Sequence, residues 1–106
     1  MEYSFRYGSN SSRKYEQNEK ETLFLDTFIQ ALPDNDRRHI HLNRMSDGTI
    51  SVYYDTYPIG KIKLQGRKFQ MQILKGLYNV KDIEGDVEVF IQYIPDWCRY
   101  IKYIKK

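Results

Sequence analysis

The stretch 40–74, IHLNRMSDGTISVYYDTYPIGKIKLQGRKFQMQIL, decides the fold of this chain. Apolar and polar residues alternate within it, which is the period of a β-strand with one buried face. Residues typical of turns divide it at 46–48, 55–58 and 65–68. The apolar positions form four runs: Ile40 and Leu42; Ile50, Val52 and Tyr54; Ile62 and Leu64; Phe69, Met71 and Ile73. The pattern therefore predicts four successive antiparallel strands.

The lengths of the loops set the register, because a slip of one residue would move every apolar side chain to the wrong face. The first loop must contain an odd number of residues, which favours a three-residue loop, 46–48, with Gly48 in the left-handed conformation. The third loop must contain an even number of residues, which favours a two-residue turn at Gly66 and Arg67. The predicted core rows are Leu42, Val52, Leu64, Phe69 and Ile40, Tyr54, Ile62, Met71. The predicted outward rows are His41, Tyr53, Lys63, Gln70 and His39, Asp55, Lys61, Gln72.

Segments on either side of this stretch have helical spacing. A helix is predicted over about 13–32, with its first half, to Glu21, in solvent and its second half apolar on one face. Residues 78–83 predict a short fifth strand. From Val87 to the C-terminus a second amphipathic segment is expected to break near Ile94, because the residue before Pro95 disfavours helix. Residues 1–12 form either an edge strand or a flexible tail.

These elements predict one domain over 1–106, of the α+β class. Its antiparallel sheet has four to five strands, and the N-terminal and C-terminal helices pack on one face to give two layers. The exposed strand edge and the tyrosine-rich side of the C-terminal helix are both self-complementary candidates for a homodimer contact.

Composition favours a soluble cytoplasmic protein. The net charge of +3 is too small to indicate nucleic-acid binding unaided. Ten tyrosines are more than a core of this size holds, so some rings are expected on the surface. The single Cys98 suits a reducing compartment, and no apolar run has the length of a membrane span or a signal-peptide core.

No group of residues predicts catalysis, a cofactor or a metal. His39 and His41 lie on one side of a strand with Asp55 near, but lack a further nitrogen or sulfur ligand, so solvated histidines are the preferred interpretation. Cys98 lies among apolar neighbours, as a small buried side chain does. Four acidic residues resemble a Mg²⁺ site, although a solvated edge and a helix N-terminus explain them better: Asp82, Glu84, Asp86 and Glu88.

The outward rows offer a candidate binding surface. We expect the partner-binding residues to be His41, Tyr53, Lys61, Lys63, Arg67 and Gln70, with Tyr100 from the C-terminal helix. Tyrosine and polar side chains suit a protein partner. Alternatively, the cations contact phosphates while the rings stack on bases, which would make the chain a nucleic-acid-binding module.

The run 59–74, IGKIKLQGRKFQMQIL, followed by IPDW at 94–97 and YIK at 100–102, resembles a group of small uncharacterised proteins of phages and mobile elements in low-GC Gram-positive bacteria. The similarity covers roughly the C-terminal half and implies an accessory gene product, a kind of protein that often blocks a host factor. The leading hypothesis is therefore a non-enzymatic binding protein that acts on a host or defence protein complex. This partner complex can itself be a nucleoprotein. An inhibitor of a CRISPR effector nuclease is one specific version.

Overall fold

The computed structural model describes residues 5–7, 17–75 and 79–105. Its elements, in chain order, are β1 (Phe5–Tyr7), α1 (Glu19–Gln30), α2 (Asp34–Arg37), β2 (Ile40–Arg44), β3 (Ile50–Tyr54), β4 (Tyr57–Lys63), β5 (Gln70–Leu74), β6 (Val80–Glu84), α3 (Val87–Ile91) and α4 (Ile94–Ile104). The predicted N-terminal segment 1–12 and the first turns of the predicted helix, 13–16, lie largely outside the described residues.

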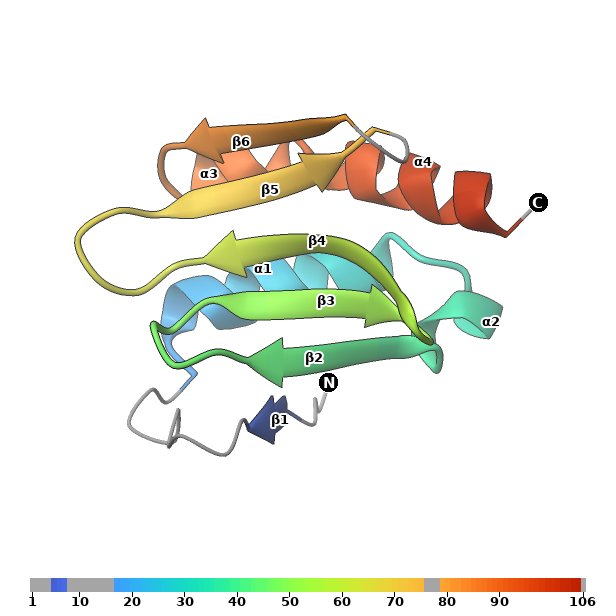
Figure 1. Cartoon of the computed structure of the whole chain (residues 1–106), viewed down its shortest axis with the longest axis horizontal. Coiled ribbons are helices and arrows are strands. Elements are labelled where there is room, and N and C mark those ends of the chain that lie inside the picture. Colours follow the sequence, from blue (N-terminus) through green and yellow to red (C-terminus); the bar gives the residue numbers. More distant parts are fainter. Residues whose placement is uncertain (1–4, 8–16, 76–78, 106) are drawn as a thin grey trace.

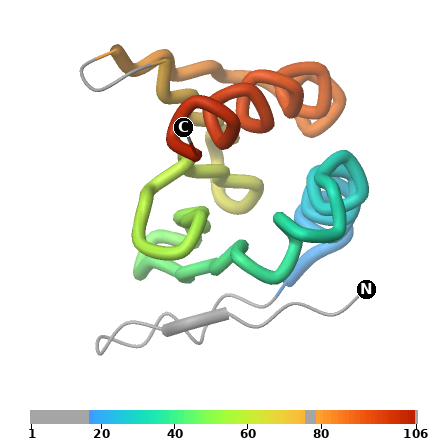
Figure 2. Tube along the Cα trace, turned by 90° about the vertical axis from the view of Figure 1, so that its right-hand side faces the viewer, coloured from blue at the N-terminus to red at the C-terminus, as the bar shows by residue number. Residues whose placement is uncertain are grey.

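The strands form one sheet in the order β1-β2-β3-β4-β5-β6. β2 to β6 pair antiparallel, and β1 adds a parallel edge strand beside β2. Helices α1, α3 and α4 lie behind the strands in Figure 1, and Figure 2 shows α1 and α3 on the same side of the curved sheet. The predicted two-layer α+β fold is confirmed. No helix of the described ranges is long and apolar enough to cross a membrane.

Two of the three predicted registers are confirmed. Leu42 lies opposite Val52 between β2 and β3, and Lys63 lies opposite Gln70 between β4 and β5. The three-residue loop 46–48 also forms: the Met45 amide donates to the Thr49 carbonyl at 2.7 Å, and Gly48 has a φ of 92°. Glycine accepts this left-handed conformation without steric cost, so the first hairpin follows from local sequence.

The predicted register between β3 and β4 is wrong. Val52 lies opposite Gly60 and not opposite Leu64, because the turn is confined to Asp55 and Thr56 and β4 begins at Tyr57. Asp55 closes this turn with a φ of 56°, a conformation that aspartate tolerates better than most residues. A register shift between Val52 and Tyr53 leaves Ile59 as an extra residue in β4, and proline is accepted in a strand beside such a bulge.

The third loop also differs from its prediction. It spans 64–69 without the predicted two-residue turn at Gly66 and Arg67, although its length is even and Gly66 keeps a φ of 86°. The Asn18 side chain donates to the Leu64 carbonyl at 3.0 Å, and Gln65 Nε2 donates to Glu21 Oε1 at 3.0 Å. The loop is therefore held open by α1, which no local turn preference could indicate.

The apolar core lies between the sheet and the helices and centres on Trp97. The indole is fully buried, meets Phe24 and Phe28 edge-on at 5.3 and 5.2 Å, and donates to the Gln72 carbonyl at 2.9 Å. Gly60 faces it across the bulge: a Cβ there would lie 2.3 Å from the Gln72 carbonyl oxygen and 2.8 Å from Trp97 Nε1. Only glycine fits this position.

We expect Gly60→Ala to destabilise the protein by roughly 2–4 kcal/mol, since the methyl group must displace strand backbone as well as the indole. Urea unfolding followed by Trp97 fluorescence measures the loss. Gly85→Ala is the matched control, because its methyl group would meet only the Val89 side chain at 3.2–3.4 Å. Equal stability of the two variants would contradict the close approach at Gly60.

A buried ion pair joins α1 to the sheet. Arg44 donates through Nη1 to Glu21 Oε2 at 2.6 Å and through Nη2 to Glu21 Oε1 at 3.1 Å, and both side chains are 0% exposed. Glu21 is also part of a capping box with Asn18, with which α1 begins. The prediction of a solvated first half of the helix is therefore wrong at Glu21: its neighbours in sequence are polar, but its partner comes from β2.

Removing one member of such a pair leaves a buried charge without its counter-charge, so Arg44→Met should lower the free energy of unfolding by about 3–5 kcal/mol. The double variant Glu21→Leu/Arg44→Met should recover part of this loss, because no charge is then left buried alone, although the capping box and the hydrogen bond from Gln65 are lost with Glu21. Urea unfolding of wild type, both single variants and the double variant measures the coupling. Losses that simply add would show that the pair acts as two independent contacts.

Candidate functional site

The face of the sheet away from the helices, called here the outer face, is the candidate site. No helix of the described ranges covers it, as Figure 1 shows from the front. Val52 of β3 and Leu64, which directly follows β4, are 0% and 1% exposed, so both lie in the core as predicted. The outer face is consequently free of any packing role toward α1, α3 and α4.

One row of side chains crosses five strands on this face. Its members stand opposite one another in the strand pairing: Asn43, Ser51, Lys61, Gln72 and Asp82. A neighbouring row contains Lys63, Gln70 and Glu84. The sequence placed the acidic residues at a separate corner, but β6 extends the sheet and brings Asp82 and Glu84 onto the same face as the two lysines.

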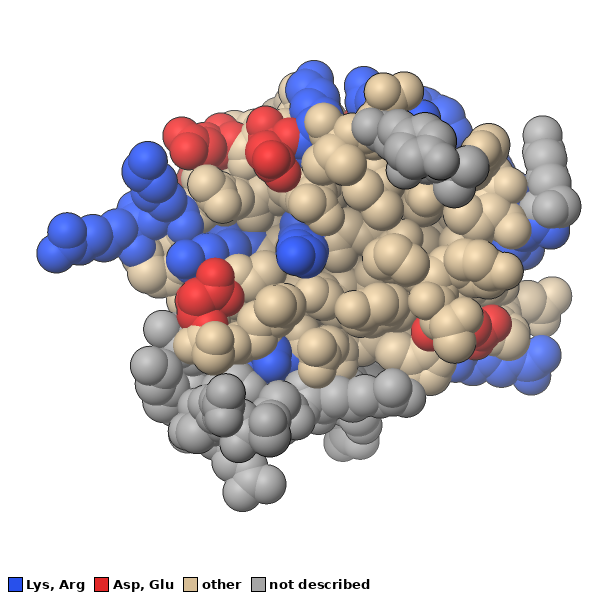
Figure 3. Space-filling model, viewed as in Figure 1, with Lys and Arg blue, Asp and Glu red and all other residues tan. Residues whose placement is uncertain are grey.

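The lysines border a hollow that we call the lysine hollow, of about 260 Å³. Its lining residues are Met45, Asp47, Thr49, Lys61, Lys63, Gln70, Gln72 and Asp82. Lys63 Nζ lies 4.0 Å from Asp47 Oδ2, while Gln70 Nε2 donates to Glu84 Oε1 at 3.5 Å. Positive and negative groups therefore alternate over a short distance, and Figure 3 shows both colours around this part of the face.

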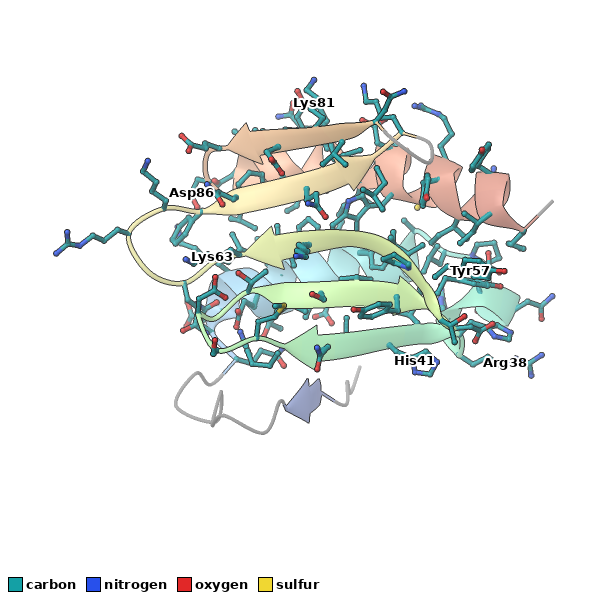
Figure 4. The ribbon with its side chains drawn as sticks, viewed as in Figure 1. Arg38, His41, Tyr57, Lys63, Lys81 and Asp86 are labelled. Carbon is teal, nitrogen blue, oxygen red and sulfur yellow. The ribbon has the colours of Figure 1, made fainter. Side chains whose placement is uncertain are left out.

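A second part of the outer face, the histidine corner, consists of His39, His41, Tyr53 and Asp55. His39 Nδ1 lies 2.9 Å and His41 Nε2 3.9 Å from Asp55 Oδ1, and His41 lies opposite Tyr53. Figure 4 shows His41 near one end of the sheet and Lys63 near the other. The β3–β4 shift thus separates Tyr53 from Lys63, which the predicted row had placed side by side. Within the described ranges, no three His, Cys, Asp or Glu side chains are arranged to hold a metal ion.

A partly buried network centred on Asp36 lies next to the histidine corner. Tyr54 stacks on His39 with ring centroids 5.1 Å apart, and its hydroxyl donates to Asp36 Oδ1 at 2.9 Å. Lys105 Nζ donates to the same oxygen at 2.9 Å. Burial raises the pKa of Asp36, but hydrogen bonds from Lys105 and Tyr54 outweigh it, so the pKa is lowered overall. The bond to Asp36 in turn raises the pKa of Lys105.

Because the native pKa of Asp36 is below its unfolded value, its contribution to stability is present above about pH 4 and is lost as the pH falls through the native pKa. Asp36→Asn should cost roughly 1–3 kcal/mol at pH 7 and flatten the dependence of stability on pH below 4. Thermal unfolding from pH 7 to pH 2.5 measures both effects. Asp34→Asn removes an exposed carboxylate from the same helix and is the control; an identical acid profile for both variants would contradict the network.

Two of the predicted partner-binding residues lie outside both parts of the outer face. Arg67 is exposed in the 64–69 loop, beyond the lysine hollow. Tyr100 belongs to α4 and lines a different cleft, where α4 meets the end of β5. The remaining five divide between the histidine corner (His41, Tyr53) and the lysine hollow (Lys61, Lys63, Gln70). The sequence analysis did not assign Asp47 and Asp82 to the hollow. For Asp82 a signal was present, because the alternation of residues in β6 places its side chain on the outer face.

The other residues considered from the sequence have structural surroundings. Cys98 is half-buried in α4, and this burial raises the pKa of its thiol. The raised pKa favours the protonated, unreactive form. Asp86 caps α3 by accepting from the Val87 amide at 2.7 Å and pairs with Lys20 at 2.6 Å. The bonds from Lys20 and from the Val87 amide lower the pKa of Asp86. Asp86 thus serves the helix, while Asp82 and Glu84 face outward from β6.

Comparison with known proteins finds no matching family model, no matching curated protein and no matching solved structure.

Proposed function

We propose that this protein is a small, non-enzymatic binding protein of the cytoplasm that docks through the outer face of its sheet onto a host or defence protein complex. The observation that supports the proposal best is the row that contains Asn43, Lys61, Gln72 and Asp82. It presents amide, cationic and anionic groups on a rigid, helix-free surface, while Ser51 within the same row is only 4% exposed. Groups of both signs at fixed spacing suit a protein partner, whose surface can match each charge with its opposite.

The hydrogen-bonding capacity of the surface supports the same function. The two lysines and two glutamines of the hollow carry donors on strands whose backbone is fixed by pairing on both sides. Side chains held on a sheet lose less conformational freedom on binding than side chains in a flexible loop, so more of the interaction energy remains as affinity. Tyr53 and His41 extend the surface with rings, which contribute contact area at protein interfaces.

The resemblance of 59–74 to small phage and mobile-element proteins directs this proposal toward an inhibitor of a host or defence factor, with a CRISPR effector complex as one target. An inhibitor of this kind acts by occupying a surface and needs no catalytic group.

Nucleic-acid binding is the second candidate, favoured by the four cations along the β4–β5 hairpin: Lys61, Lys63, Arg67 and Lys68. The carboxylates of Asp47, Asp82 and Glu84 oppose it, because they stand within the same surface and repel phosphates. Lys68 Nζ lies 3.9 Å from Glu84 Oε1, so one of the four cations already faces a carboxylate.

Immobilised protein exposed to lysates of low-GC Gram-positive hosts tests the leading proposal. We expect Lys61→Gln/Lys63→Gln to reduce recovery of the partner complex at least about tenfold, since charges at the centre of an interface are often critical to binding. Lys102→Gln, which removes a cation from the helical layer, should leave recovery unchanged. All three proteins should have the same melting temperature within about 2 °C, because Lys61 and Lys102 are exposed and the pairing of Lys63 with the exposed Asp47, at 4.0 Å, is a weak surface ion pair.

Unchanged recovery with the double lysine variant would reject the outer face as the docking surface. For the second candidate, anisotropy with labelled single-stranded and double-stranded DNA and RNA is measured from 50 to 300 mM salt. Affinity that falls steeply with salt and is abolished by the same lysine variant would replace the protein-docking proposal with nucleic-acid binding. Size-exclusion chromatography with light scattering on the same samples establishes whether a homodimer is the binding form.

A further inference from the structure

A cleft lies where α4 meets the C-terminal end of β5, well apart from the lysine hollow. It has a volume of about 260 Å³ and is lined by Ile73, Leu74, Lys75, Asp96, Arg99, Tyr100 and Tyr103. We call it the α4 cleft. Two aliphatic side chains and two aromatic rings supply most of its wall, and the charged groups lie among them.

The aromatic wall consists of stacked tyrosines. The rings of Tyr100 and Tyr103 lie 5.8 Å apart at an angle of 28°, with Tyr100 half-buried and Tyr103 54% exposed. Tyrosine in this partly exposed state is a typical anchor point of protein interfaces, because it offers a large apolar area and loses little conformational freedom.

The wall is also rigid, because α4 is fixed at both ends. Trp97 holds its first half through the hydrogen bond to the Gln72 carbonyl, and Lys105 holds its end through the buried Asp36 carboxylate. A cleft fixed in this way requires little reorganisation when a ligand enters, which favours binding.

The charge that the α4 cleft presents to solvent is positive. Arg99 Nη1 donates to Asp96 Oδ1 at 2.9 Å, but the Arg99 side chain is 76% exposed and the Asp96 side chain only 22%. Lys75 is exposed on the opposite wall, at the end of β5. An occupant therefore meets two accessible cations, one from α4 and one from the end of β5, together with an apolar lining.

We propose that the α4 cleft is a second docking site, which takes an acidic segment of a partner protein with one aromatic or aliphatic side chain as its anchor. The anchor lies against Leu74, Tyr100 and Tyr103, and flanking carboxylates of the segment pair with Lys75 and Arg99. A protein segment fits better than nucleic acid, because the aliphatic centre formed by Ile73 and Leu74 suits an apolar side chain and offers no hydrogen-bond partner to a phosphate. The inference rests on the proposed binding function and adds a second surface to it.

Three synthetic peptides, titrated into ¹⁵N-labelled full-length protein, test this proposal. They are an acidic peptide with a central tryptophan (EEWEE), its basic counterpart (KKWKK) and an acidic peptide without the anchor (EEAEE), all with blocked ends. We expect saturable shifts of the Leu74, Arg99 and Tyr103 amides with EEWEE, and affinities at least tenfold weaker for the other two. Raising the salt concentration should weaken EEWEE binding, because the two cation contacts are exposed.

Variants separate the contributions of the cleft. Tyr103→Ala and Arg99→Gln should each weaken EEWEE binding about tenfold, whereas Lys61→Gln/Lys63→Gln should leave it unchanged, because those lysines line the other surface. The far-ultraviolet circular dichroism and melting temperature of each variant verify that α4 is intact.

Absence of saturable shifts, equal affinity for EEWEE and KKWKK, or shifts at the α4 cleft with oligo(dT) and none with EEWEE would each overturn the proposal. These outcomes are distinct from failure of the outer face. If only the α4-cleft proposal fails, recovery of the partner from lysate still depends on Lys61 and Lys63. If only the outer-face proposal fails, EEWEE still binds to the α4 cleft.

Discussion

The ion pair between Glu21 and Arg44 is the contact on which the relation between the two layers depends. Glu21 accepts from Arg44 and from Gln65, and Arg44 also donates to the Gly48 carbonyl at 3.0 Å. One carboxylate thus connects the beginning of α1 with β2, with the 46–48 loop through Arg44, and with the 64–69 loop. Two fully buried charges are stable here because several hydrogen bonds compensate their loss of hydration. With this end of the sheet attached to α1 from behind, the outer face takes no part in holding the layers together.

The opposite end of the sheet has its own polar attachment, built on Asp36. Tyr54 reaches this carboxylate from β3, and Lys105 reaches it from the end of α4. Between these two attachments the layers meet through apolar contacts centred on Trp97. Apolar packing is non-directional and leaves some freedom to slide, whereas buried hydrogen bonds have required partners and fix one alignment. The combination holds the outer face and the α4 cleft in fixed positions on the same core in a chain of 106 residues.

The sequence predicted those parts of the structure that local rules determine. Gly48 and the alternation around Leu42 and Val52 were sufficient to predict the β2–β3 register. The length of the turn and the alternation of buried residues require the same register there. The β3–β4 register was not predictable from the same rules, since it depends on the Asp55 conformation and on a bulge that fits Gly60 beneath Trp97. That error placed Lys63 beside Tyr53, whereas in the structure Pro58 lies opposite Tyr53 and Lys61 lies opposite Ser51. The candidate site was consequently predicted as a set of outward residues, but its division into a histidine corner and a lysine hollow required coordinates. Tyr100 was misplaced for a related reason: helical spacing shows which residues share a helix face, but not which edge of the sheet that face meets.

β5 connects the two proposed surfaces mechanically. Gln70 and Gln72 face the lysine hollow, while Ile73 to Lys75 line the α4 cleft, so both sites include the same short strand. This strand is paired on both sides and tied to Trp97 through the Gln72 carbonyl, so it does not bend independently of α4. A partner with two matching elements would engage the second after the first without a further loss of translational freedom, and its affinity would exceed that of either contact alone. Under the proposed binding function, this arrangement would add specificity, because a competitor would have to match both the charge pattern of the outer face and the α4 cleft at a fixed distance from it.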